Sequence, residues 1–333
     1  MLKKREAPEG IHFHPIYRFG RLHPTRLLAP WYFWKRLRQL RPDLIIVCTY
    51  ELLLPATLYK MLTACRLVYD VQENYAANIR YGSRLPLPGL WAHLTRGLER
   101  LAHPWVDLYL LAERCYAQEM PWMCTKAVKI LNAFAPPQGS PSLAKNQMSG
   151  APLQLVYSGT MGEAYGTLEA IKLAKHISTF RSIRLVLVGY CPDAAYRQHL
   201  YRAINGVDWI QSIGIDQLVS YEEVIKQVSM ADVALTAYQL RPHLLQRIPT
   251  RFYEYLSLGL AIVYPKNPVW GRFLGMEEQF FPIDYQCIDQ NSLVQWLQSW
   301  PKEGAHATPQ PEWLWSHEEK KLIEAIDHLM RHN

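Results

Sequence analysis

The stretch IPTRFYEYLSLGL, from Ile248 to Leu260, predicts one complete helix with both of its ends marked. Thr250 suits the N-cap position, and the proline before it favours a non-helical entry. Gly259 suits the left-handed residue that follows a helix, and an apolar run up to Tyr264 then predicts a strand. A helix followed at once by a buried strand is typical of α/β domains.

The first turn of this predicted helix carries two charged side chains, Arg251 and Glu254. Free N–H groups and the positive end of the helix dipole suit a phosphate, and the guanidinium adds a fork of donors. The carboxylate of Glu254 can accept two hydrogen bonds from a ribose diol. A purely structural role is the alternative. Glu254 would then only interact favourably with the positive end of the helix dipole, and Arg251 would be solvated at the surface.

Length, composition and cysteine usage set the class of protein. A chain of 333 residues favours two domains, and a hydrophobic fraction of 49% is that of folded α/β proteins. The six cysteines form no C-x-x-C pair, which argues against a zinc site and fits a reducing compartment. Because no apolar run reaches the length of a membrane span and no signal peptide is visible, a cytoplasmic location is expected.

The charge is unevenly distributed along the chain. Residues 1–150 carry a formal charge of +10 and the remainder −3, which predicts a basic first half that meets something anionic. The densest part is WYFWKRLRQLR, from Trp31 to Arg41. On a helix this pattern suits peripheral contact with an anionic membrane, or an ordinary surface helix with its aromatics in the core. Scattered bases and the absence of a known module argue against nucleic-acid binding.

Strands and helices alternate on both sides of a Pro- and Ser-rich linker at residues 136–150. Unbroken apolar runs such as 44–48 predict parallel strands buried on both faces. Before the linker we expect strands at 10–16, 44–48, 66–71, 106–111 and 128–131, and helices at 30–40, 55–63, 90–101 and 113–120. After it we expect strands at 153–157, 184–188, 207–210, 233–237 and 260–264, and helices at 166–177, 193–203, 221–228, 250–258 and 317–331.

This order predicts an α/β protein with two Rossmann-like domains that face each other across a cleft. The expected divisions are an N-terminal domain at 1–135, the linker, a second domain at 151–315, and a C-terminal helix at 316–333. Polar residues Gln72 and Glu73 follow the strand that ends at Val71, where open α/β sheets bind ligands. After the strand ending at Tyr157, the turn of Ser158, Gly159 and Thr160 offers backbone N–H groups to a phosphate. No G-x-G-x-x-G, Walker A or D-x-D sequence is present, so we expect neither a nicotinamide cofactor nor a metal.

Several of these pieces, in this order, resemble the GT-B glycosyltransferases, specifically the family-4-like retaining enzymes of glycosyl transferases group 1. The pieces that carry the resemblance cover most of the chain. They are LVYSGT at 155–160, LVLVG at 185–189, ADVAL at 231–235, the segment 248–259, NPVW at 267–270, DVQE at 70–73, and residues 107–116.

The resemblance implies a transferase that moves a sugar from a nucleotide-diphosphate donor to a glycan or lipid-linked acceptor, as in polysaccharide assembly. It implies retention at the sugar and no metal or cofactor. By the same resemblance Glu254 would hold the ribose, and the last helix would pack back on the N-terminal domain. The nucleotide-sugar site would comprise Ser158, Gly159, Thr160, Gly189, Thr250, Arg251 and Glu254.

Three departures from the family pattern bear on catalysis. Gln246 stands where the family often has a glutamate, eight positions before Glu254, and Gln72 stands where a histidine is usual. The strand, glycine-containing loop and helix that usually open the family's first lobe are also missing before residue 1. Candidate catalytic residues are therefore Gln72, Glu73 and Gln246. Alternative expectations are an inactive GT-B homologue that acts as a binding or partner subunit, and a GT-B sugar-nucleotide epimerase.

Overall fold

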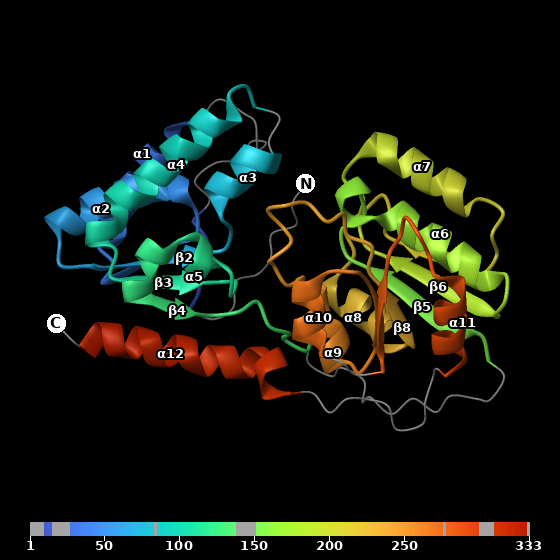
Figure 1. Ribbon diagram of the computed structural model, residues 1–333. Helices are drawn as coiled ribbons and strands as arrows, with labels where there is room; N and C mark the ends of the chain where they lie inside the picture. The colour runs from blue at the N-terminus through green and yellow to red at the C-terminus, as the bar shows by residue number, and fades with distance from the viewer. Residues whose placement is uncertain are drawn as a thin grey trace. The chain divides into compact units, whose positions relative to one another are not determined.

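The computed structural model describes residues 10–14, 27–82, 85–137, 151–275, 278–299 and 310–331. The chain divides into two compact units (Figure 1). Unit 1 comprises residues 1–131 with 323–333, and unit 2 comprises residues 132–322. Each unit contains one parallel sheet flanked by helices, which confirms the predicted α/β fold with two Rossmann-like domains. Most of the predicted linker, residues 138–150, lies outside the described residues.

Unit 1 is built on a four-stranded parallel sheet in the order β1-β2-β3-β4. Leu67, Tyr69 and Val71 of β2 point into a core closed by helices, in which α2 packs against both α1 and α4. The strands are β1 (Leu44–Val47), β2 (Arg66–Val71), β3 (Leu108–Leu111) and β4 (Ala127–Lys129). The helices are α1 (Ala29–Leu40), α2 (Leu53–Leu62), α3 (Tyr75–Gly82), α4 (Pro88–Ala102) and α5 (Tyr116–Glu119).

Four features of unit 1 differ from the sequence prediction, the first being the helix predicted at 113–120, of which only Tyr116–Glu119 are α-helical. The predicted strand at 10–16 is wrong for residues 10–14, and residues 15 and 16 lie outside the described residues. Strand β1 is an edge strand and leaves Ile46 47% exposed, so it is not buried on both faces. Helix α3 was not predicted. It begins after Asn74, whose side chain accepts the N–H of Ala77 at 3.2 Å and so caps the first turn.

Unit 2 is built on a six-stranded parallel sheet in the order β10-β9-β8-β5-β6-β7. The strands are β5 (Leu153–Ser158), β6 (Ile183–Val188), β7 (Ile210–Ile213), β8 (Val233–Leu235), β9 (Ala261–Pro265) and β10 (Phe280–Ile283). The helices are α6 (Thr167–Ser178), α7 (Ala194–Ile204), α8 (Tyr221–Ser229), α9 (Thr250–Ser257), α10 (Pro268–Leu274) and α11 (Gln290–Gln298). Of these elements, α10, β10 and α11 were not predicted, and the strand predicted at 207–210 is wrong in position because β7 begins only at Ile210.

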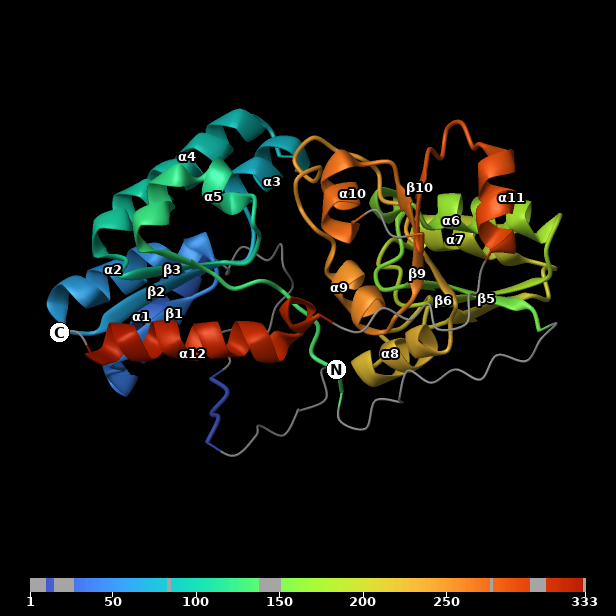
Figure 2. The ribbon, with the colours of Figure 1, turned by 60° about the horizontal axis from the view of Figure 1, so that its bottom comes forward.

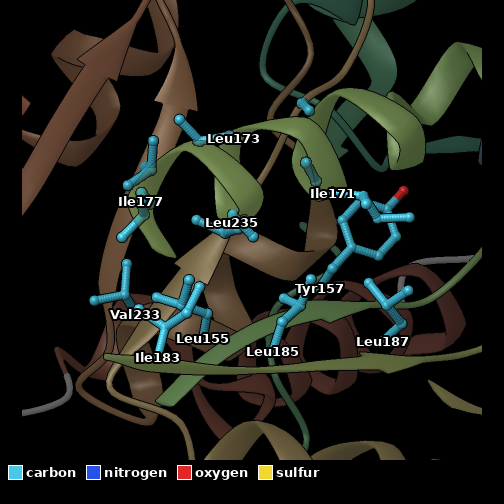
Figure 3. Packing of buried hydrophobic residues seen from close by; sticks show 14 of the residues in the cluster. Leu155, Tyr157, Ile171, Leu173, Ile177, Ile183, Leu185, Leu187, Val233 and Leu235 are labelled. Atoms are coloured by element: carbon cyan, nitrogen blue, oxygen red, sulfur yellow. The ribbon is translucent and has the colours of Figure 1, made fainter. Parts of the chain in front are cut away.

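Both faces of the unit 2 sheet are covered. Leu155 and Leu185 of adjacent strands pack with Ile171 of α6 on one face (Figure 3). On the other face Val156 and Ile262 pack with residues of α8, α9 and α10. Side chains alternate between the faces because successive residues of a strand point in opposite directions. The carboxyl ends of the strands therefore sit on a rigid, doubly covered sheet.

The last helix, α12 (Trp315–Arg331), crosses the division between the units, and its residues from Ile323 onward are assigned to unit 1 (Figure 2). Within unit 2, the two residues just before α12 pair with the chain that follows β4. Phe134 forms a parallel bridge with Leu314, and its N–H donates to the carbonyl of Trp313 at 2.8 Å. Among the described residues, no helix is both long enough and apolar enough to cross a membrane.

Candidate functional site

Two glycine turns meet at the carboxyl ends of β5 and β6. The N–H of Gly159 donates to the carbonyl of Val188 at 2.8 Å, and a Cβ on Gly189 would lie 1.8 Å from the carbonyl oxygen of Gly159. Gly159 has φ +90°, a conformation that residues with a side chain rarely adopt. Both positions therefore require glycine, and the two turns pack backbone against backbone.

One N–H group of the first turn is left for a ligand. The N–H groups of Gly159 and Met161 donate to the carbonyls of Val188 and Tyr190. The residue between them, Thr160, is exposed, and its N–H has no acceptor among the described residues. An exposed N–H in a tight turn is suited to bind an anion.

Arg251 lies directly beneath this turn and is only 7% exposed. Its Nη2 donates to the carbonyl of Thr160 at 3.0 Å, and a Cβ on Gly159 would lie 2.6 Å from the same nitrogen. Its guanidinium carbon lies 5.1, 5.4 and 5.8 Å from the ring centres of Tyr157, Tyr238 and Tyr165, within cation–π range. These contacts exclude the reading of Arg251 as a solvated surface residue.

Among the described residues, Arg251 forms no salt bridge within 4 Å, and its neighbours are mainly aromatic. Its Nη1 is buried and has no hydrogen-bond partner in the described part of the chain. A buried donor left without a hydrogen bond costs free energy and is rare in native structures. The cation also places positive potential immediately behind the turn of Gly159 and Thr160.

Helix α9 holds Arg251 and Glu254, and its ends differ slightly from those predicted. Thr250 is its first residue rather than its N-cap, a position that Pro249 occupies, and no side chain caps the helix. The prediction was wrong because Thr250 already has helical geometry, whereas Pro249 (φ −57°, ψ 132°) does not. At the other end Gly259 has φ +65°, and the N–H of Leu260 donates to Tyr255 at 2.9 Å, which confirms the predicted stop.

Glu254 faces a pocket of about 370 Å³ within unit 2. Burial raises the pKa of its carboxyl to about 7, although Arg251 and a hydrogen bond from Tyr221 act in the opposite direction. Tyr221 is the first residue of α8. The pocket is lined by Asn132, Ala133, Phe134, Ala135, Tyr221, Thr250, Glu254 and Trp315. Its volume falls within the range of small-molecule sites, and its carboxylate can accept hydrogen bonds from a diol.

Two further predicted residues of unit 2 have different surroundings. The hydroxyl of Ser158 is buried and lies 2.8 Å from that of Tyr255, so Ser158 ties β5 to α9 rather than facing a ligand. Gln246 is exposed in the segment before α9. Sequence reasoning missed Tyr221, Trp315 and the three tyrosines around Arg251. They come from distant segments and carried no local motif.

In unit 1 the predicted residues Gln72 and Glu73 are exposed at the carboxyl end of β2. The Gln72 amide donates to Asp70 at 2.5 Å, and a Glu73 carboxylate oxygen accepts from Asn78 of α3 at 2.7 Å. Burial raises the pKa of Asp70. Both side chains are thus held by neighbours on rigid elements.

A partly buried network that the sequence did not indicate supports this edge of the sheet. Asn74 donates to Glu119 at 2.6 Å and accepts from Arg96 of α4 at 2.7 Å. Arg96 also pairs with Glu99 at 3.1 Å, and Glu99 accepts from the hydroxyl of Tyr69. The network links β2, α4 and α5 behind the exposed residues. Within the described residues, no group of three or more His, Cys, Asp and Glu is placed to hold a metal ion.

Comparison with solved structures identifies the architecture. No protein-family model matches the chain, and no curated protein sequence matches it. Sucrose-phosphate synthase from Thermosynechococcus elongatus superposes with a TM-score of 0.66 at 12% identity, over 96% of this chain and 82% of that one. The catalytic domain of starch synthase IV from Arabidopsis thaliana, bound to ADP and acarbose, gives 0.61 at 13% identity over 94% and 79%. The Anabaena protein HepE in complex with UDP-glucose gives 0.61 at 12% identity over 92% and 84%.

These likenesses extend over nearly the whole chain. They show that the chain has the GT-B fold, as the sequence resemblance predicted. At this level of identity they show the fold alone.

Proposed function

We propose that the chain is a glycosyltransferase that moves a sugar from a nucleotide-diphosphate donor to an acceptor hydroxyl in glycan or lipid-linked sugar assembly. The observation that carries the proposal is that one helix of unit 2, α9, holds both Arg251 and Glu254. Glu254 faces a pocket large enough for a ribose, and the guanidinium of Arg251 lies beneath a glycine turn whose Thr160 N–H is free among the described residues. Solved structures of the same fold bound to ADP or UDP-glucose add support.

In the proposed site Glu254 accepts hydrogen bonds from the ribose hydroxyls, with Thr250 beside it in the pocket wall. The N–H of Thr160 and the uncapped first turn of α9 bind the diphosphate. Arg251 acts from beneath, through its charge. When the bond between sugar and diphosphate breaks, negative charge grows on the leaving phosphate, where these preorganised donors stabilise it. The proposed reaction needs neither a metal nor a cofactor.

Unit 1 is assigned to the acceptor. Gln72 can hydrogen-bond a sugar hydroxyl but cannot transfer a proton, and the same holds for Gln246 of unit 2. Glu73 is the ionisable member of the three candidate catalytic residues, and Asn78 orients its carboxylate. We assign retention at the sugar carbon to the reaction, together with a cytoplasmic location and peripheral contact with an anionic membrane.

A second candidate is an inactive GT-B homologue that binds a nucleotide sugar or a partner without transfer. The amides at Gln72 and Gln246 favour it, because neither can supply the charge that a glutamate or a histidinium would.

One product assay separates the candidates. The full chain is incubated with UDP-, GDP- and ADP-sugars, with and without a bacterial lipid and glycan extract, and both nucleotide and sugar products are identified. A transferase releases nucleoside diphosphate and labels the extract, and Glu254→Gln slows it. A new sugar nucleotide without release indicates an epimerase. Donor binding without turnover indicates the inactive homologue, and neither binding nor turnover by a folded protein refutes the nucleotide-sugar site.

A further inference from the structure

The outward faces of α2 and α4 in unit 1 are unusually apolar. The two helices pack side by side in the helical layer (Figures 1 and 2). Their exposed side chains include Leu62 at 74% and Leu87 at 71%. The complete set, here called the α2–α4 face, is Leu54, Leu58, Met61, Leu62, Leu87, Leu90, Trp91, Leu94 and Leu101.

This exposure does not come from a lack of apolar residues on the inner side. Helix α2 already buries Leu53, Ala56 and Tyr59 against the sheet, and α4 buries Ala92 and Ala102. Yet residues 54, 58 and 61 repeat at helical spacing on the outside of α2, as do 87, 90, 91 and 94 at α4. A helix over a soluble sheet normally turns a polar side outward, and contiguous exposed apolar patches mark interaction sites.

Backbone geometry adds a second observation at one end of this face. Leu87, just before α4, adopts the left-handed conformation (φ 53°, ψ 52°) and exposes its side chain. A bulky residue in this region is strained, and such strain is retained where the surrounding structure or a function requires it. Here the strained turn presents a leucine to the outside at the start of α4.

Bases outnumber acids around the face. Helices α1, α2 and α4 together contain six Lys and Arg and one acid, Glu99. Glu99 is 1% exposed and paired with Arg96, so these three helices expose no acidic side chain. Beside the face, exposed Asp43 shares a pocket with Leu62, but Arg38, Arg41 and Arg66 line the same pocket, so bases outnumber acids there as well. A face of leucines and a tryptophan, bordered mainly by bases, matches an anionic bilayer surface.

Helix α1 continues this pattern. Of its aromatic residues, Trp34 packs edge-on against Tyr59 at 6.1 Å, whereas Trp31 remains 58% exposed beside Lys35. The alternative that the aromatic residues of this helix simply pack in the core is therefore right for Trp34 and wrong for Trp31. Tryptophan and lysine at the edge of an apolar face are typical of a membrane interface.

We infer that unit 1 docks on an anionic lipid bilayer through the α2–α4 face, with the bases of α1 and α4 contacting lipid phosphates. This inference adds an acceptor class to the proposed function. The docking itself does not depend on the proposed function, but the acceptor class does. Docking places the acceptor-side unit at a lipid surface, so the acceptor class is a lipid-linked sugar rather than a free glycan. The leucines enter the acyl boundary while the arginines remain at headgroup level.

The test is co-sedimentation of the full chain with vesicles of phosphatidylcholine alone and with added phosphatidylglycerol. We expect binding to the anionic vesicles that weakens with salt. The variant L58E/L94E places one charge on each helix, and we expect it to lower the partition coefficient by roughly tenfold or more. The matched control is Leu218→Glu, because Leu218 is a 79% exposed leucine of unit 2, and this variant should bind as the wild type does.

A second pair of variants tests the electrostatic part without touching the leucines. Arg36→Gln and Arg100→Gln alter exposed bases, and each should weaken binding about fivefold, with a smaller effect at high salt. Circular dichroism and thermal melting establish that every variant is folded. Equal binding of the wild type and L58E/L94E, or no binding by the folded wild type, overturns the inference.

Two further readouts separate the remaining outcomes. If light scattering shows a dimer that L58E/L94E dissociates, and vesicles do not bind, the face joins two copies and the lipid inference is wrong. Nucleotide titration of the same samples isolates the proposed function. Vesicle binding by a protein that binds no nucleotide supports the docking face and refutes only the donor site.

Discussion

Binding of a nucleotide at Glu254 should depend on pH in a way that the surroundings of the carboxyl dictate. Burial raises its pKa to about 7, and a ribose diol donates hydrogen bonds to the ionised form. Below this pKa the nucleotide must first displace a proton, so the apparent affinity falls with the ionised fraction. That fraction is about 0.1 at pH 6 and about 0.9 at pH 8, which predicts roughly tenfold tighter binding at pH 8.

Calorimetry in two buffers of different ionisation enthalpy measures this linkage directly. Binding should release about 0.9 proton at pH 6 and about 0.1 at pH 8. Glu254→Gln is the control, because it keeps the shape of the side chain and reports any proton that comes from the nucleotide phosphates. Tyr221→Phe removes a hydrogen bond that lowers the pKa of Glu254, so its midpoint should move to higher pH. Identical pH profiles for the wild type and Glu254→Gln would refute the assignment of the ribose to Glu254.

Three further predictions concern stability. Gly159→Ala should cost about 1–3 kcal/mol more than Gly206→Ala in urea unfolding. Both glycines have positive φ, but only the Cβ at 159 would meet the buried Arg251; equal costs would contradict the packing described. Arg96→Met should lower the free energy of unfolding by roughly 3 kcal/mol at pH 8, because it leaves Glu99 buried without its ion-pair partner. Adding Glu99→Gln should restore most of that stability, which a double-mutant cycle would measure. Because the pKa of Glu254 rises from 4.5 to about 7 on folding, its contribution to stability declines as pH increases through that window. Glu254→Gln should therefore be more stable than the wild type at pH 8, by up to about 3 kcal/mol, and not at pH 4.5.

The parts of the fold that could be predicted are those with a strong local signal. Strand β2 was predicted with its exact bounds because an apolar run ends at polar residues, and α9 because Pro249 and Gly259 mark its ends. Helices α10 and α11 were missed although Asn267 and Asp289 cap them, accepting backbone N–H groups of their first turns. Asparagine and aspartate at these two positions are a local signal that the sequence contains.

The candidate site was predictable only where its residues share one segment. Arg251 and Glu254 share a helix, so their proximity follows from helical spacing. The tyrosines that surround Arg251 come from β5, the turn before α6 and the loop after β8, and Tyr221 comes from α8. Their convergence depends on the order of strands in the sheet, which no local pattern encodes. The burial of Arg251 follows from that convergence and for the same reason could not be predicted.

The apolar outer faces of α2 and α4 show the same limit. Periodicity predicts that one side of each helix is buried, but it cannot show that the other side remains exposed when both sides are apolar. Leu58 was expected only as part of the helix at 55–63, and Leu54 was not placed in any element. The layer order of α1, α2 and α4, known from the structure, shows that they point away from the core.

The measurement that tests the central claim most directly is calorimetric titration of UDP, GDP and ADP into the full chain at pH 8, with Glu254→Ala in parallel. The site described predicts that at least one of the three nucleotides binds and that the alanine variant, still folded, loses that binding. Failure of all three to bind the folded wild type, or undiminished binding by Glu254→Ala, would contradict the account.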